Sequence, residues 1–337
     1  MSACDPALLD DIRQLHEQIR ASVAARLEAA REAGDHELAS RPLGWGAGDL
    51  TYALDQLADE PLAQCVARVG ARRPVVMLAE GPGELRAAPS GPSSQSPLRL
   101  IVDPIDGTRP LMLDMRSAWV LTGAAPDRGG DTRLSDIELA VQTELPTTGA
   151  AVYHVLIARR GQGATLARHD VATGACLDQR PLRVLPELPL DNGVISFSRY
   201  LPPERPLVAE LERRFLEAAV PACELDPHLL YDDQYLCTSG QLFLLATGRY
   251  RMLADLRGWI GRTRGLANFA VKPYDLASAL VFEEAGVPLL DAEGRPFDGP
   301  MDLETGLDLV AYANARIRDA FEPHLRAAMA SWSGSPS

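Results

Sequence analysis

The sequence predicts a mixed α and β protein in which sheets and helices lie in layers. Helix-like and strand-like segments alternate irregularly along the 337 residues, and both hairpin-like and crossover-like connections are present. Hydrophobic residues make up 46% of the chain, which is enough for a large core. We expect an N-terminal α+β domain over 1–187, a C-terminal α/β domain over 188–330 and a disordered tail over 331–337, with the boundary in a Pro-rich link.

The N-terminal half predicts one long helix followed by several strands. Apolar residues recur at spacings of three and four over residues 6–33, which is typical of an amphipathic helix. A second helical stretch covers 50–70, and residues 81–97 are rich in Pro, Gly and Ser and predict a loop. Strands are expected at 74–80, 98–102, 117–125 and 136–145, and two more within 151–167.

The C-terminal half predicts a strand at 193–198 and a helix at 205–220. Another helix ends at Gly248, as the left-handed backbone of glycine favours. A further helix is expected within 274–290, with Asp275 at its start and Gly286 just beyond its end.

Composition and charge exclude several classes of function. A formal net charge of -13 and a pI of about 5.0 argue against nucleic-acid binding, although a bound metal can still attract a small phosphorylated substrate. The five cysteines are scattered without CxxC spacing, which favours reduced thiols in a cytoplasmic protein. We find neither a signal-peptide pattern nor an apolar run long enough to span a membrane.

The segment "IVDPIDGT", residues 101–108, predicts a metal site. An apolar strand stops at Asp103, and Asp106 follows three residues later. Between them, Pro104 fixes the backbone, so that a tight turn can expose the Ile105 carbonyl. Two carboxylates and a carbonyl are hard oxygen ligands, which suit Mg²⁺ or Mn²⁺ rather than zinc.

The residues that follow suggest a phosphate site. Gly107 and Thr108 would begin a helix, where free N–H groups attract a phosphate. Glu80 and Asp275 also stand at the ends of predicted elements, so all these acids can converge on one cleft. The alternative is a capped turn whose carboxylates only accept hydrogen bonds from the backbone.

Two segments carry a resemblance to a known family. "IVDPIDGT" and "KPYDLASALVFEEAG" (272–286) resemble the two signatures of the inositol monophosphatase family. That family belongs to the lithium-sensitive, Mg²⁺-dependent sugar phosphatase superfamily, which includes fructose-1,6-bisphosphatase. The likeness runs from about residue 45 to 318. It implies a layered α-β-α-β-α sandwich and a homodimer.

The resemblance also implies a set of metal ligands. Glu80, Asp103 and the Ile105 carbonyl would hold one Mg²⁺. Asp103, Asp106 and Asp275 would hold a second, and Mn²⁺ can substitute.

The resemblance further implies which residues position the attacking water and bind the substrate. Thr108 would position the attacking water together with Glu80, and the backbone N–H groups of Gly107 and Thr108 would bind the phosphate. Asp55 matches an aspartate that supports this water and a third, looser metal. Asp255 falls where the family often has an acid that hydrogen-bonds the substrate's hydroxyl groups.

The implied activity is hydrolysis of a small polyol or sugar phosphate by a metal-activated water, with no phosphoenzyme. Fructose-1,6-bisphosphatase and 3′(2′),5′-bisphosphate nucleotidase activities are alternatives within the same class. A non-catalytic dimeric scaffold that keeps the fold is an alternative from another class.

The chain departs from the family pattern at several positions. Gly81 replaces a second glutamate, and Tyr52 replaces the threonine of the early segment. Arg109 follows the "DGT" triplet, where the family has a polar residue, and we expect it to contact the substrate.

The link between Asp255 and Asp275 is about a dozen residues longer than usual in the family, and it carries Arg257, Arg262 and Arg264. It is interpreted either as a lid or phosphate clamp, since arginine binds phosphate bidentately, or as a solvated surface insertion.

Overall fold

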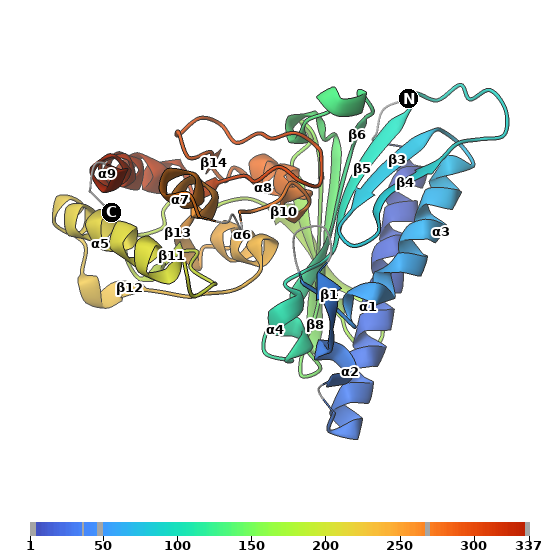
Figure 1. The fold of residues 1–337 in the computed structure, drawn as a ribbon, viewed down its shortest axis with the longest axis horizontal. Coiled ribbons are helices and arrows are strands. Elements are labelled where there is room, and N and C mark those ends of the chain that lie inside the picture. The colour runs from blue at the N-terminus through green and yellow to red at the C-terminus, as the bar shows by residue number, and fades with distance from the viewer. Residues whose placement is uncertain (1–4, 36, 46–49, 267–269, 334–337) are drawn as a thin grey trace.

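The protein has a five-layer architecture, seen in a computed structural model that describes residues 5–35, 37–45, 50–266 and 270–333 (Figure 1). An outer helical layer covers one face of a large sheet, a second helical layer separates this sheet from a smaller one, and a third covers the far face of the smaller sheet. The predicted α-β-α-β-α sandwich is therefore confirmed. From the outer layer on the large sheet to the outer layer on the smaller one, the helices are α1 (Pro6–Ala33) and α3 (Asp59–Gly70), then α6 (Thr238–Ala246) and α8 (Ala279–Ala285), then α5 (Arg205–Ala222) and α9 (Ala315–Ser333).

The large sheet has eight strands in the order β10-β9-β8-β7-β6-β5-β3-β4. Their bounds are β3 (Val75–Ala79), β4 (Gly83–Ala87), β5 (Leu98–Asp106), β6 (Ala118–Pro126), β7 (Leu139–Leu145), β8 (Val152–Arg159), β9 (Ala164–Asp170) and β10 (Cys176–Leu182). Among the described strands of this sheet, only β3 and β5 pair in parallel, with Ala79 opposite Val102. This register brings the residues that follow, Glu80 and Asp103, to the same edge of the sheet.

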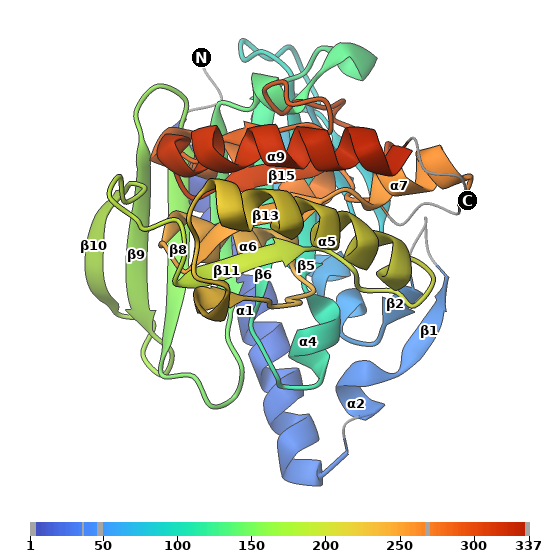
Figure 2. The same cartoon turned by 90° about the vertical axis from the view of Figure 1, so that its left-hand side faces the viewer.

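The smaller sheet has five strands in the order β12-β11-β13-β15-β14. They are β11 (Gly193–Phe197), β12 (Leu230–Tyr231), β13 (Tyr250–Asp255), β14 (Leu289–Leu290) and β15 (Leu309–Tyr312). Helices α5 and α9 lie side by side across this sheet (Figure 2). The remaining named elements are α2 (Glu37–Ser40), the β1 (Pro42–Trp45) and β2 (Leu50–Tyr52) pair, α4 (Thr108–Met112) and α7 (Arg257–Arg264).

Two apolar clusters hold the layers together. One lies between α1, α3 and the near face of the large sheet, where Ile12, Leu15 and Val69 are buried. The other runs from the opposite face of the large sheet through the smaller sheet to Phe215 and Phe321 under the outer helices. The two sheets therefore share a core. The predicted boundary at 187/188 falls in the segment that leads from β10 to β11.

Several predicted elements differ in the N-terminal half. The predicted helix over 50–70 begins as strand β2 and a 3₁₀ turn, and α3 starts only at Asp59. The predicted loop over 81–97 contains β4, an edge strand that pairs with β3. Glu84 and Arg86 point from β4 into solvent, so its composition resembles that of a loop.

Two expectations at the C-terminal end are also corrected. The predicted helix over 274–290 is shorter, because Asp275 lies in a 3₁₀ turn (Tyr274–Leu276) and α8 covers only Ala279–Ala285. The tail predicted over 331–337 is helical at 331–333, and residues 334–337 lie outside the described part. Trp332 is buried, which explains why α9 continues that far. Within the described ranges, none of the helices combines the length and apolar character that crossing a membrane requires.

Replacing Trp332 with alanine should destabilise the protein through loss of buried packing. The Trp332 ring lies 5.1 Å from the ring of Trp259, and the guanidinium of Arg264 stacks over it at 4.2 Å. We expect the free energy of unfolding to fall by about 3–5 kcal/mol, measured by urea denaturation. Leu177→Ala on β10, where the side chain is 53% exposed, is the control and should change it by less than about 0.5 kcal/mol. Equal effects of the two substitutions would contradict this account of α9.

Candidate active site

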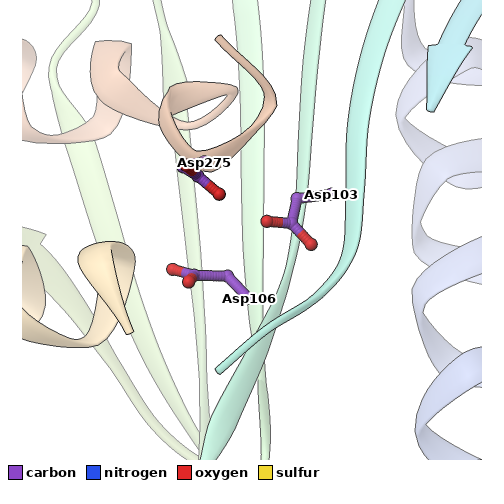
Figure 3. Close-up of side chains that lie close together, drawn as sticks. All are labelled: Asp103, Asp106 and Asp275. Atoms are coloured by element: carbon purple, nitrogen blue, oxygen red, sulfur yellow. The ribbon is translucent and has the colours of Figure 1, made fainter. Parts of the chain in front are cut away.

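Three carboxylates converge between the large sheet and the middle helical layer. Asp103, Asp106 and Asp275 each offer one oxygen, and these oxygens lie within 4.8 Å of one another. Figure 3 shows the three side chains pointing into a common space. Asp103 and Asp106 come from the end of β5, whereas Asp275 comes from the 3₁₀ turn before α8. The sequence therefore predicted three acids that the fold does bring together.

Glu80 lies beside this group but is not one of its three members. It follows β3 directly, and its backbone N–H donates to the Val102 carbonyl at 3.2 Å. Its negative charge helps to raise the pKa of Asp103. Glu80 therefore stands next to Asp103, as the predicted ligand set requires.

The end of β5 is shaped by an irregularity in its pairing with β6 between Asp103 and Asp106. Within it, the Asp103 carboxylate accepts a hydrogen bond from the N–H of Ile105 at 3.0 Å. The Thr108 hydroxyl oxygen lies 2.9 Å from the Ile105 carbonyl oxygen, one of two acceptors within reach of its single proton. Ile105 is buried, and it lines a cavity over the acids.

The N-terminus of α6 holds Asp106 in place. The Asp106 carboxylate accepts hydrogen bonds from the N–H of Thr238 at 3.2 Å and of Ser239 at 2.6 Å. The Cys237 thiol lies 3.1 Å from the Asp106 carbonyl oxygen and 3.4 Å from its carboxylate. Sequence reasoning missed this contact, although "CTSG" before an apolar run is a helix-start signal.

The close contact between α6 and Asp106 requires glycine at position 107. Its φ is 100°, in the left-handed region that glycine adopts readily. A Cβ at this position would lie 2.9 Å from the Cβ of Cys237 and 3.1 Å from its sulfur. Any other residue would therefore push α6 away from Asp106.

Thr108 and Asp55 form a hydrogen-bonded pair. The Thr108 Oγ1 lies 2.8 Å from Oδ1 of Asp55, to which it can donate. The other Asp55 oxygen accepts from the Tyr52 N–H at 2.7 Å, which fixes the carboxylate. The two residues predicted to handle water are therefore adjacent.

A cavity of about 200 Å³ opens over the acids and is lined by both halves of the chain. All the predicted site residues except Asp255 line it. The Asp255 carboxylate is engaged in a bidentate pair with Arg257, and Arg257 is the member of the pair that lines the cavity. Arg109 lies over the Tyr52 ring at 5.8 Å, also at the cavity wall.

Burial raises the pKa values of the three acids, and neighbouring negative charges add to the rise for Asp103 and Asp275. Burial is the largest cause for each, and it raises the pKa of Asp103 well above its ordinary value. The pKa of Asp106 rises less, because the α6 donors favour its charged form. Burial and the charge of Asp106 raise the pKa of Asp275 to about 7.

This donor set fits a divalent cation. It consists of charged oxygens that repel one another in a poorly solvated space, and a cation between them would relieve the repulsion. Oxygen-only coordination is the kind that Mg²⁺ and Mn²⁺ prefer.

Comparison with known proteins finds similarity at the level of structure. No family model and no curated protein sequence match the chain. The fructose-1,6-bisphosphatase of Leishmania major in its holo form aligns with a TM-score of 0.65 and 14% identity, over 93% of this chain and 94% of that one. The extragenic suppressor protein suhB of Bartonella henselae aligns with a TM-score of 0.63 and 20% identity, over 95% and 98%.

The inositol monophosphatase-II of Staphylococcus aureus aligns with a TM-score of 0.58 and 15% identity, over 98% of this chain and 99% of that one. At such identities a structural match establishes the fold. Because the matches span nearly the full length of all three proteins, the chain has the fold of the inositol monophosphatase and fructose-1,6-bisphosphatase superfamily.

Proposed function

We propose that the protein is a Mg²⁺-dependent phosphomonoesterase that hydrolyses a small polyol or sugar phosphate. The observation that carries this proposal is the convergence of Asp103, Asp106 and Asp275 at the floor of a cavity that also contains the Thr108–Asp55 pair. Two buried carboxylates and a half-buried one that only repel one another would cost stability, whereas a bound cation would stabilise them.

The ligand set would be shared between two ions. Glu80, Asp103 and the Ile105 carbonyl would hold one, and Asp103, Asp106 and Asp275 the other. Mn²⁺ would substitute for Mg²⁺, and a third, looser position beside Asp55 is part of the proposal. When bound, such ions polarise phosphate oxygens, lower the pKa of a water and stabilise the leaving oxygen.

The chain's own groups would orient the reactants. Because the Thr108 hydroxyl can donate to Asp55, its oxygen can accept a hydrogen bond from a water and direct a lone pair of that water towards phosphorus. Glu80 would take a proton from the same water. The N–H groups of Gly107 and Thr108, with Arg109 beside them, would bind the phosphate oxygens.

The state of the thiol at the cavity wall is also consistent with direct attack by water. Cys237 is buried, and burial raises the pKa of its thiol well above the ordinary value, so the nucleophilic thiolate is disfavoured. A covalent intermediate on this sulfur is therefore not part of the proposal.

The resemblance adds three further proposals: inhibition by lithium, a homodimeric state and a cytoplasmic location. Fructose-1,6-bisphosphatase and 3′(2′),5′-bisphosphate nucleotidase activities are the alternatives within the class. A panel of inositol monophosphates, sugar monophosphates, fructose 1,6-bisphosphate and adenosine 3′,5′-bisphosphate would separate them. EDTA-sensitive phosphate release from one member would support the proposal, whereas a protein that binds no divalent ion would fit the scaffold alternative.

Replacing Asp103 with asparagine should abolish both metal binding and turnover, because one shared ligand of both ions loses its charge. Mg²⁺ binding is measured by calorimetry, and circular dichroism shows whether the variant is folded. Asp131→Asn, on an exposed turn, is the charge-matched control and should behave like the wild type. A folded Asp103→Asn protein with near-normal turnover would refute the ligand assignment.

Replacing Thr108 with valine keeps the shape of the side chain but removes its hydroxyl. We expect kcat to fall about 100-fold or more, the scale of a lost proton-handling group. Thr108→Ser, which restores the hydroxyl, should recover most of the rate. If the valine variant keeps the wild-type kcat, Thr108 does not position the water.

The affinity for Mg²⁺ should depend on pH. The pKa of Asp275 is raised to about 7 in the folded protein, so this group is protonated below that pH and must lose its proton to bind a cation. Because the pKa of Asp103 is raised as well, affinity should fall by at least about tenfold per pH unit as pH decreases below 7.

The same shift makes the metal-free protein less stable as pH rises from the ordinary pKa of an aspartate towards 7, since the folded form then holds the extra proton. Thermal unfolding in EDTA and in Mg²⁺ between pH 5.5 and 8 would show a gap that widens with pH. An affinity and a gap that stay constant over this range would contradict the assignment.

A further inference from the structure

The three arginines of the long link between Asp255 and Asp275 have different positions. Arg262 forms an ion pair with Asp308 and its side chain is 52% exposed. Arg264 stacks over Trp332 under the end of α9. Arg257, at the start of α7, lines the cavity above the metal-ligand acids. Of these three side chains, only Arg257 is therefore placed to meet a substrate.

The guanidinium of Arg257 is held on one edge and one face. Its Nε and Nη2 donate to the two Asp255 oxygens at 2.8 and 2.7 Å, with side chains that are 11% and 1% exposed. The ring of Tyr200 covers one face, 4.8 Å away. The Tyr200 hydroxyl lies 3.0 Å from the Tyr235 carbonyl and 2.8 Å from Gln241, which fixes the ring.

The helix that carries Arg257 is anchored as well. The N–H of Trp259 donates to Asp308 at 2.6 Å, and the Trp259 ring packs on Trp332. Helix α7 is therefore anchored in this structure and contributes Arg257 to the cavity wall. Arg257 is oriented before any ligand arrives, so binding would cost little side-chain entropy.

The remaining edge of the Arg257 guanidinium carries N–H donors that no described residue accepts. An arginine has five N–H donors, and Nη1 of Arg257 has no hydrogen-bond partner among the described residues. Asp255 accepts on the opposite edge. The pair thus presents N–H groups, and not carboxylate oxygens, to the cavity.

We propose that Arg257 binds a second anionic group of the substrate, a phosphate or a carboxylate, at a distance from the phosphate that is hydrolysed. The substrate class would be phosphomonoesters that carry a second anion. This inference rests on the proposed phosphatase function and narrows its substrate. The cavity is lined by Asp55, Glu80 and the three acids, whose negative charges would repel such a molecule. A guanidinium that is already oriented would offset this repulsion by binding the second anion.

Non-hydrolysable ligands test this inference by binding alone. The probes are alkylphosphonates two to six carbons long, the α,ω-bisphosphonates of the same lengths and the matching ω-phosphonocarboxylates. Each is titrated into the full-length protein with Mg²⁺ by calorimetry. At one or more lengths, a doubly anionic ligand should bind about 10- to 100-fold tighter than its alkylphosphonate. The better of the two doubly anionic series identifies phosphate or carboxylate.

Variants of the protein test whether the preference for doubly anionic ligands is due to Arg257. Asp255→Asn with Arg257→Gln removes both charges together, so that no buried carboxylate is left unpaired, and should reduce the preference about tenfold or more. Arg262→Gln, outside the cavity, should leave it unchanged. A second readout is the ratio of kcat/KM for fructose 1,6-bisphosphate and fructose 1-phosphate, which should fall in the double variant.

Three results would overturn the inference. Equal binding of singly and doubly anionic ligands at every length would mean that Nη1 serves a neutral hydroxyl. A preference that survives in the double variant but is lost in Arg109→Gln would place the second anion at Arg109. In both cases Mg²⁺-dependent phosphonate binding would leave the phosphatase proposal standing, whereas absence of any such binding, with no phosphate release, would remove both.

Discussion

The mutual repulsion of buried carboxylates is the constraint on which the rest of this site depends. Asp103, Asp106 and Asp275 lie in a poorly solvated space, where like charges are costly. Each carboxylate accepts at least one backbone N–H, from Ile105, Ser239 and Lys272. These donors orient the oxygens but cannot cancel their charge. A divalent cation would, and this is why we interpret the arrangement as a metal centre.

The fold supplies these contacts from segments far apart in the chain. Parallel pairing of β3 and β5 places Glu80 beside Asp103, and the irregularity at the end of β5 turns Asp106 towards α6. Asp275 arrives from the C-terminal half, on a turn capped by its own carboxylate. The site therefore combines residues from both halves of the chain, whose sheets share an apolar core.

Sequence reasoning succeeded where the signal was local. The strand and the short helix around Asp103 and Thr108 follow from an apolar run and a glycine, and the structure has both. The strand was predicted to stop at Asp103, whereas β5 continues to Asp106, and the expected tight turn at Pro104 is an irregularity in its pairing with β6. Sequence reasoning failed where tertiary contacts decide. The contact of α6 with Asp106 joins residues 133 positions apart, and no periodicity reveals it. The role of Arg257 depends on which of three arginines faces inward. The edge strand β4 was missed because its outward face is polar, as in a loop.

The central claim is that the three carboxylates form a divalent metal centre, and the most direct test is to locate the ion. Crystals soaked in Mn²⁺ would be measured at the manganese absorption edge, and an anomalous difference map would show the ion without assumptions about activity. The account predicts a peak between Asp103, Asp106 and Asp275, at the coordination distances typical of oxygen ligands. A protein saturated with Mn²⁺ whose peaks lie only elsewhere on its surface would contradict it.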